Sequence, residues 1–261
     1  MKILIIGDVV GRAGRRAVKT LLPRIADLHA PDIVIANGEN VAGGFGLTDE
    51  TVKELFAAGV HILTTGNHVW NKKEIYEILE REPRILRPAN YPPGAPGRGS
   101  GVFCSDGGVK FGVINLSGRV FMGNLDCPFR CAETLVEVLR KETNTILVDF
   151  HAEATSEKVA LGWFLDGRVT AVVGTHTHVQ TADERLLDHG TAYMTDLGMT
   201  GPVDSVIGVK KELVIGKFLS QMPIRFETAT GRVCLSGAVI DVDESSGRAR
   251  SIERVYELYD G

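Results

Sequence analysis

Short apolar runs alternate with amphipathic helical patterns along the first two-thirds of the chain. The runs KILIIGD, DIVIANGEN and HILTTGNH predict three strands, each of which ends on polar residues. The segment after the first run predicts a helix whose apolar face holds Val18, Leu21, Leu22, Ile25 and Leu28. Pro23 lies inside this pattern and is expected to kink the helix or to move its start. Strands that alternate with helices are typical of an α/β fold.

The next two helices have recognisable ends. Thr48 is predicted to cap the helix after the second strand, and Gly59 is predicted to close it. Asn71, with Glu74 three residues later, is predicted to open the helix after the third strand, and Pro83 stops it. These signals place one helix after each of the first three strands.

Residues 83–101 interrupt the alternation, because they contain five of the ten prolines. A loop of this length in a compact domain is usually functional or mobile, so this segment and residues 195–201 are expected to border a pocket. The segment is followed by a predicted hairpin and by further helices and strands: residues 102–115, helix 131–141, strand TILVDF, helix 156–165 and strand VTAVVG.

The last third of the chain has a different pattern. After a predicted helix at residues 209–219, the alternating stretches IRFETAT, RVCLSGAVIDVD and RARSIERVYEL predict antiparallel strands. Together, these elements predict an α/β protein in which mixed β-sheets pack as a sandwich with flanking helices. Residues 1–261 are expected to form a single domain.

Composition narrows the class of protein. Of the 261 residues, 44% are hydrophobic and 24% are charged, as in ordinary globular proteins. No apolar run approaches the roughly 18–20 residues that cross a bilayer, so no membrane partner is expected. The net charge of −4 argues against a protein that coats nucleic acid, which must neutralise phosphates. The first apolar run leads directly into Gly7 and Asp8, which predicts a strand rather than a signal peptide, and a cytoplasmic location.

The cysteines and the antiparallel end carry weaker signals. Cys104, Cys127, Cys131 and Cys234 are too few and too scattered for a disulfide framework, so buried or half-buried free thiols are expected. Apolar residues of the antiparallel end could pack against a second copy of the chain, and the sequence gives no number of copies for such a homo-oligomer.

Side chains that bind metals collect where the predicted strands end. Eight of them follow five apolar runs: Asp8; Glu39 and Asn40; Asn67 and His68; His151; and His176 and His178. Ligands of α/β sheets lie at the carboxyl ends of the strands, so these side chains are expected to meet at one edge.

A metal site is the interpretation that this set favours. Buried carboxylates without partners are costly, and a cation removes that cost. Nitrogen and oxygen ligands together suit a pair of transition metal ions better than Ca²⁺ or Mg²⁺ alone. Two ions about 3.5–4 Å apart would hold the attacking and leaving oxygens of a displacement at phosphorus. His176 and His178 give the strongest signal, whereas His29, His61 and His189 lie outside the pattern.

Two rival interpretations concern the same segments. Gly7, Gly11 and Gly14 suggest a nucleotide-cofactor loop, but their spacing is one residue wider than the dinucleotide fingerprint. Asp8 and Glu39 taken singly could be helix N-caps. Their position at the same edge as the histidines favours the metal interpretation.

The residues also resemble a known family. The motifs Gly7-Asp8, Gly38-Glu39-Asn40, Gly66-Asn67-His68, His151 and Gly174-Thr175-His176-Thr177-His178 look like the dispersed motifs of the calcineurin-like metallophosphoesterases. The chain resembles most closely the YmdB-type subfamily of 2′,3′-cyclic nucleotide phosphodiesterases, over nearly its whole length. Val9-Val10 after Asp8 and Val69 after His68 depart from the general superfamily pattern. The subfamily shares both departures, which narrows the assignment.

The resemblance implies a four-layer αββα fold and a pair of metal ions. One ion would be held by Asp8, Glu39, Asn40 and His178, and the other by Glu39, Asn67, His151 and His176. A hydroxide that bridges the ions would attack phosphorus, with His68 as the general acid for the leaving ribose oxygen or as an electrophile. The family usually carries iron or manganese, and these ligands also accept zinc.

The expected activity is therefore hydrolysis of small cyclic nucleotides, such as 2′,3′-cyclic nucleotides, by a metal-dependent phosphodiesterase. A nucleotide-sensing regulatory protein with the same metal site and little turnover is an alternative, because His68 lacks the usual neighbouring carboxylate. A metal-dependent amide or ester hydrolase is a third interpretation, in which the metals would ignore phosphodiesters.

Overall fold

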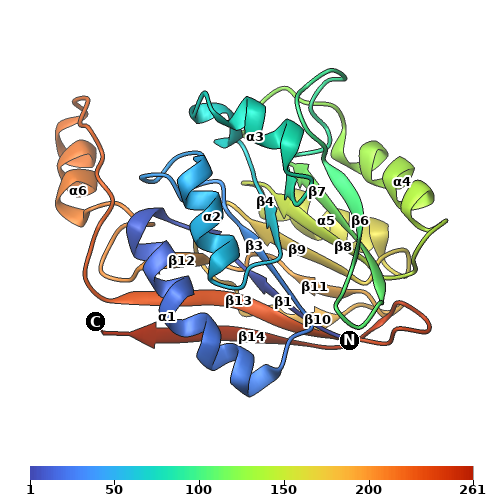
Figure 1. Cartoon of the computed structure of the whole chain (residues 1–261). Coiled ribbons are helices and arrows are strands. Elements are labelled where there is room, and N and C mark those ends of the chain that lie inside the picture. Colours follow the sequence, from blue (N-terminus) through green and yellow to red (C-terminus); the bar gives the residue numbers. More distant parts are fainter. Residues whose placement is uncertain (261) are drawn as a thin grey trace.

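Apolar runs form two β-sheets in the computed structural model, which describes residues 1–260 (Figure 1). The first sheet has the strand order β2-β12-β13-β1-β3-β4-β5, and β14 also pairs with β13. Its strands are β1 (Lys2–Ile6), β2 (Asp8–Val9), β3 (Ile33–Asn37), β4 (Ile62–Thr64), β5 (Ile85–Leu86), β12 (Met199–Pro202), β13 (Val233–Val242) and β14 (Ala249–Tyr259). The strands β1, β3, β4 and β5 are parallel, and β13 runs antiparallel to its neighbours.

The second sheet has the order β10-β11-β9-β8-β7-β6. Its strands are β6 (Ser100–Cys104), β7 (Lys110–Ser117), β8 (Ile146–His151), β9 (Ala171–Thr175), β10 (Arg185–Leu186) and β11 (Ala192–Met194). The helices are α1 (Gly11–His29), α2 (Asp49–Ala57), α3 (Ile75–Arg81), α4 (Pro128–Leu139), α5 (Thr155–Leu165) and α6 (Lys211–Ser220), with a 3₁₀ turn at Val69–Asn71.

The hydrophobic core consists of three clusters, because the central strands of the two sheets are buried on both faces. Along β1, Ile3 and Ile5 pack into the cluster between the two sheets, whereas Leu4 and Ile6 pack under the helices on the other face. The outer face of the second sheet packs against α4 and α5 through residues such as Val136. Helices therefore cover both outer faces of a sheet-on-sheet sandwich (Figure 1), which confirms the predicted fold class.

The first helix differs from its prediction at two positions. It runs unbroken from Gly11 through Pro23, whose side chain lies on the exposed face where water can satisfy the carbonyl left without a donor. Leu28 is 72% exposed, so its predicted place on the apolar face is wrong. The buried face ends at Ile25, and the last turn has no packing neighbour there.

The ends of the second helix are as predicted, and the start of the third is not. Thr48 caps α2 in a capping box with Thr51. Asn71 instead ends the 3₁₀ turn, and α3 begins only after Glu74. The Glu74 carboxylate accepts a hydrogen bond from the backbone of Asp49, so it caps the neighbouring helix rather than its own.

The stretch IRFETAT, residues 224–230, forms no strand, which corrects the prediction for the last third. Its one ladder contact is an isolated bridge between Val209 and Thr228. The physical reason is that β13, the strand that follows this segment, already pairs with β1, β12 and β14 and has no edge left for it. The segment runs beside residues 206–209 instead.

The prediction of buried or half-buried free cysteines is correct for three of the four. The four cysteines are free, and three are buried or half-buried, but Cys104 is exposed because it ends the edge strand β6.

Within residues 1–260, no helix combines the length and the apolar character needed to cross a membrane.

The ion pair between Lys158 and Asp196 is buried, and its two side chains are each about 1% exposed (2.6 Å). We expect Lys158→Met to lower the free energy of unfolding by about 3–5 kcal/mol, because the carboxylate is left buried without its cation. Urea denaturation measures this. Lys53→Met removes an exposed pair with Asp49 and serves as the matched control, with little change expected. Equal losses in both variants would contradict the prediction.

Candidate metal centre and substrate cavity

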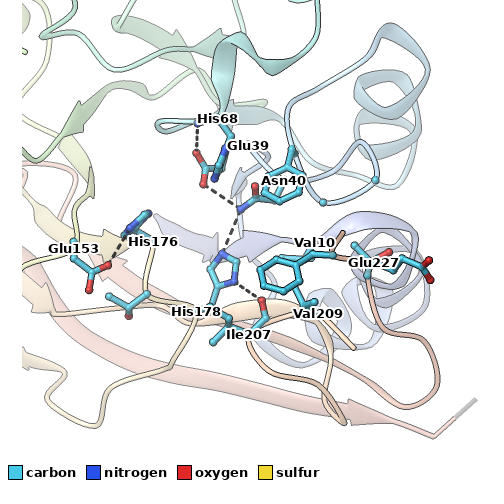
Figure 2. Close-up of a pocket in the computed structure, with 17 residues that line it drawn as sticks. Val10, Glu39, Asn40, His68, Glu153, His176, His178, Ile207, Val209 and Glu227 are labelled. Atoms are coloured by element: carbon cyan, nitrogen blue, oxygen red, sulfur yellow. Dashed lines mark hydrogen bonds and ion pairs between the residues drawn. The ribbon is translucent and has the colours of Figure 1, made fainter. Parts of the chain in front are cut away.

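The carboxyl ends of strands from both sheets meet at one place, as the sequence predicted. Asp8 lies in β2, Glu39 and Asn40 follow β3, and Asn67 and His68 follow β4. From the second sheet, His151 ends β8, and His176 and His178 follow β9. All eight side chains named from the sequence come from this edge, and Figure 2 shows several of them around one cavity.

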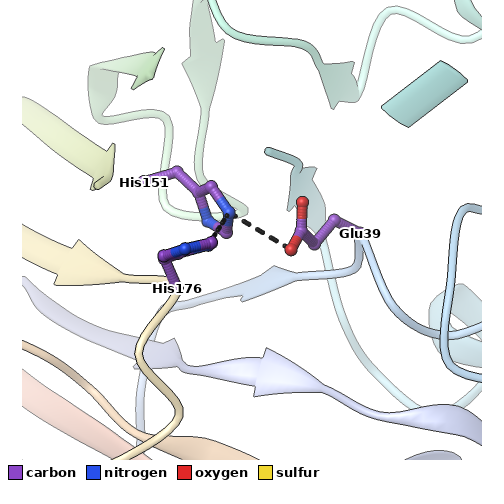
Figure 3. A group of neighbouring side chains, drawn as sticks. All are labelled: Glu39, His151 and His176. Carbon is purple, nitrogen blue, oxygen red and sulfur yellow. Dashed lines mark hydrogen bonds and ion pairs between the residues drawn. The ribbon is translucent and has the colours of Figure 1, made fainter. Parts of the chain in front are cut away.

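One group of these side chains is arranged as metal ligands would be. Ligand atoms of Glu39, His151 and His176 all lie within 4.8 Å of one another (Figure 3). The Nε2 atom of His151 lies 3.2 Å from Glu39 Oε1, 3.0 Å from His176 Nδ1 and 2.9 Å from Asn67 Oδ1. A single ring nitrogen carries at most one proton and cannot serve three such neighbours. A cation among these atoms would serve all of them.

A second group shares Glu39 with the first. Asn40 Nδ2 donates to Glu39 Oε1 (3.1 Å) and lies 3.3 Å from His178 Nε2. Asp8 Oδ1 lies 3.7 Å from the same ring nitrogen. Within residues 1–260, Asp8 Oδ1 and Asn40 Oδ1 are buried without a hydrogen-bond partner. Orphaned buried oxygens beside an imidazole fit a bound metal ion, because otherwise their lost hydration is uncompensated.

Each of the three imidazoles is held from outside the cluster. His151 Nδ1 lies 3.0 Å from the hydroxyl of Thr175, and His176 Nε2 lies 3.1 Å from Glu153 Oε2. His178 Nδ1 lies 2.9 Å from the carbonyl oxygen of Ile207. When the outer nitrogen donates to such an acceptor, the inner nitrogen keeps a free lone pair. This is the usual arrangement around metal-binding histidines.

The hydroxyl of Thr175 connects His151 to a buried carboxylate. Thr175 donates to Asp149 Oδ1 (2.7 Å), which leaves its oxygen to accept from His151. Asp149 Oδ2 also accepts from Asn37 (3.1 Å) and from the hydroxyl of Thr64. Burial raises the pKa of Asp149 to about 6, although these hydrogen bonds oppose the shift. The network fixes the ring of His151 from the side opposite the cluster.

The loop that carries His176 and His178 has an unusual backbone. Both residues have positive φ angles, of 102° and 65°, which side chains other than glycine rarely adopt. Between them, Thr177 donates its backbone N–H and its hydroxyl to Asp196 Oδ2 (3.2 and 2.8 Å). The buried Lys158 donates to the same oxygen. Asp196 thus holds the strained loop in place.

Charges in the cluster stabilise one another. Burial opposes ionisation of Asp8, but the close approach of the His178 ring and the charges of His178 and His151 outweigh it and lower the pKa of Asp8. Burial likewise opposes protonation of His178, yet the same contact with Asp8 raises the pKa of His178 to about 9. The pKa of Glu39 is lowered against its burial, chiefly by His151. Both carboxylates are therefore anionic, as metal ligands must be.

Close packing explains the glycines of these motifs. A Cβ atom at Gly66 would overlap the ring of His151 and the carboxylate of Glu39. At Gly7 and Gly14 it would overlap the backbone oxygens of Gly198 and Thr200. This packing against neighbouring backbone accounts for Gly7 and Gly14 without a nucleotide cofactor.

His68 lies at the edge of the cluster, and its ring is oriented by an aromatic side chain rather than by a carboxylate. Its backbone N–H donates to Glu39 Oε2 (3.0 Å). Its ring packs against the ring of Phe45, with centroids 4.9 Å apart and planes at 64°. Val69, which follows His68, is buried and apolar, so the aromatic contact with Phe45 restrains the ring.

A cavity of about 380 Å³ opens beside the cluster (Figure 2). Its polar side holds Glu39, Asn40, His68, Glu153, His176 and His178, and its rim is formed by residues 43–45, 207–209 and 226–228. Residues 83–101 and 195–201 do not line it, so the predicted pocket borders are wrong. Arg87 donates to backbone carbonyls of residues 88–97, so it closes the first of these segments on itself.

Several residues at the site escaped the sequence analysis. Glu153, Thr175 and Asp196 orient the imidazoles and their loop, and Phe45 and Ile207 border the cavity. Glu153 and Thr175 lie within two residues of a predicted ligand, which was the available signal. Nothing local distinguishes Asp196 or Ile207, because their contacts come from distant segments.

Two packed sheets with histidines, carboxylates and amides at the carboxyl ends of their strands define a metallophosphoesterase-like protein. A family model described as YmdB-like protein matches residues 4–255. The chain belongs to this family, which confirms the resemblance seen in the motifs.

Similar proteins are known from several bacteria. A 2′,3′-cyclic-nucleotide 2′-phosphodiesterase of Bacillus subtilis is 50% identical over 98% of this chain and 96% of its own length. A hypothetical protein from Thermus thermophilus has a solved structure that matches with a TM-score of 0.92 at 43% identity, covering 99% of each chain. A Mycoplasma pneumoniae structure described as a novel phosphatase matches with a TM-score of 0.93 at 35% identity, covering 100% of this chain and 94% of its own.

The role of the Thr175 hydroxyl can be tested by substitution. We expect Thr175→Val to weaken binding of Mn²⁺ or Zn²⁺ by about 10–100-fold, because His151 loses the acceptor that fixes its ring. Thr175→Ser keeps the hydroxyl and should bind metal like the wild type. Chelator competition, followed by elemental analysis, measures the affinities. Equal affinity of the Val and Ser variants would show that the hydroxyl does not position His151.

Proposed function

We propose that this chain is a metal-dependent phosphodiesterase that hydrolyses 2′,3′-cyclic nucleotides to nucleoside monophosphates. The observation that carries the proposal is the pair of ligand groups that share Glu39 at the floor of a cavity, with orphaned oxygens on Asp8 and Asn40. The name of the Bacillus subtilis relative, at 50% identity, supports the substrate class. We assign Asp8, Glu39, Asn40 and His178 to one ion and Glu39, Asn67, His151 and His176 to the other.

The proposed division of roles follows the charges of the site. When bound, two transition metal ions supply Lewis acidity toward phosphate oxygens and lower the pKa of a water molecule. Asp8 and Glu39 carry the negative charge that retains the cations. The three imidazoles would bind as neutral ligands, each with its outer nitrogen donating to Thr175, Glu153 or Ile207, and a bound cation would displace the proton from the inner nitrogen of His178.

His68 is the proposed general acid. It lines the cavity next to Glu39 and is not part of either ligand group. An oxygen nucleophile derived from water attacks phosphorus, the bond from phosphorus to one ribose oxygen breaks, and His68 gives its proton to that oxygen. Phe45 packs against the ring and limits the directions in which it can present the proton.

The first experiment combines metal analysis of the purified protein with turnover of 2′,3′-cyclic AMP. We expect about two equivalents of iron, manganese or zinc and a cyclic-nucleotide activity that chelation removes. Glu39→Gln should lose the activity and part of the metal, because the residue shared by both groups loses its charge. Glu257→Gln, an exposed change on β14, is the control and should retain both. Bound metal without turnover of any phosphodiester would favour the nucleotide-sensing alternative.

A second experiment separates His68 from the metal ligands. We expect His68→Ala to reduce kcat for 2′,3′-cyclic AMP by about 10²–10⁴-fold while the metal content stays at the wild-type value. Elemental analysis and steady-state kinetics are measured on the same preparation. Loss of metal in this variant would instead make His68 a ligand and would overturn its role as the acid.

A further inference from the structure

The cavity has an apolar wall, of which the proposed phosphate chemistry uses only the contact between Phe45 and His68. Phe45, Ile207 and Phe226 line it together with Val209, on loops that precede or follow strands of the first sheet. Phe45 and Ile207 are 42% and 53% exposed. Large apolar side chains that stay exposed next to a charged cluster indicate a surface that contacts a ligand.

Ile207 has a backbone conformation that its side chain disfavours. Its φ angle is +46°, in the left-handed region, where a β-branched residue is an outlier. Its carbonyl oxygen nevertheless lies 2.9 Å from His178 Nδ1, so this conformation contributes to holding an imidazole of the cluster (Figure 2). Asn or Gly at this position would relieve the strain and keep the carbonyl. An isoleucine in this strained conformation therefore points to a use for the side chain itself.

The wall begins in contact with the proposed acid. The ring of Phe45 lies against the ring of His68, at a centroid distance of 4.9 Å. Lys217 lies over the ring of Phe226 at 4.7 Å, which fixes that aromatic side chain at the rim. A ligand whose phosphate reaches the ligand groups would thus place its other end against aromatic and aliphatic surface.

We propose that Ile207, Phe45 and Phe226 form a wall that binds the nucleobase of the substrate and selects nucleotides over other phosphodiesters. This proposal rests on the proposed function. A 2′,3′-cyclic nucleotide has a charged phosphate and ribose at one end and a flat, weakly polar heterocycle at the other, which matches the two sides of this cavity. A volume of about 380 Å³ is near the lower end of ligand sites and suits a single nucleotide rather than a chain.

The test compares two substrates that differ only in the base: 2′,3′-cyclic AMP and ribose 2′,3′-cyclic phosphate. The quantity compared is kcat/KM for 2′,3′-cyclic AMP divided by kcat/KM for ribose 2′,3′-cyclic phosphate. In Ile207→Asn we expect this ratio to fall about tenfold, mainly because KM for 2′,3′-cyclic AMP rises. Phe45→Ala should lower the same ratio. Ile207→Val keeps an apolar wall and should retain the wild-type ratio. Ile215→Asn, a matched change at an equally exposed isoleucine on α6, should also retain the wild-type ratio.

Folding of the variants is checked by thermal melting. Asn tolerates the left-handed region, so the melting temperature of Ile207→Asn should be at or above that of the wild type. A ratio that stays at the wild-type value in Ile207→Asn and Phe45→Ala would overturn the proposal. An equal fall in Ile215→Asn would also overturn it, since the effect would then not depend on the wall.

A binding measurement separates this proposal from the proposed function. Calorimetry with adenosine 3′-monophosphate and with inorganic phosphate requires no turnover. We expect Ile207→Asn to weaken nucleotide binding about tenfold and phosphate binding by less than about twofold. Equal weakening of both ligands would overturn the base-binding wall. A wild-type protein that hydrolyses neither cyclic phosphate would contradict the proposed function, while the two affinities would still decide the assignment of the wall.

Discussion

The structure depends on the burial of two carboxylates, Asp8 and Glu39, where the strands of both sheets end. Neither side chain retains meaningful contact with solvent, and their charges are balanced only by imidazoles in the described part of the chain. Such an arrangement is costly unless cations join it. The close-packed glycines, the strained loop at His176 and His178 and the buried Lys158–Asp196 pair all serve to keep this set of groups in place.

Outer contacts matter as much as the inner ligand atoms. Each imidazole donates to a different kind of acceptor: a hydroxyl at Thr175, a carboxylate at Glu153 and a backbone carbonyl at Ile207. Thr175 and Glu153 lie at or just after the ends of strands of the second sheet, and Ile207 lies in a loop between β12 and α6, so the orientation of the rings is set by the tertiary structure. A cluster held in this way is preorganised, and little rearrangement is needed when a ligand arrives.

Much of the fold and of the cluster was predictable from the sequence, because strands buried on both faces give continuous apolar runs that end on polar residues. That pattern located Asp8, Glu39 and the histidines. It could not reveal that Asp196 contacts Thr177 or that Ile207 contacts His178, because no local sequence pattern indicates which distant loops meet. The stretch 224–230 was misassigned because its alternation resembles a strand, and whether a sheet edge is free depends on the other strands.

The cluster and the cavity wall have different structural origins. Asp8, Glu39 and Asn67 come from the first sheet, and His151 and His176 come from the second, so the cluster spans the seam of the sandwich. The wall residues all come from loops of the first sheet alone. Substitutions of side chains in these loops can therefore change which ligands fit the cavity while the two sheets keep the alignment on which the polar centre depends.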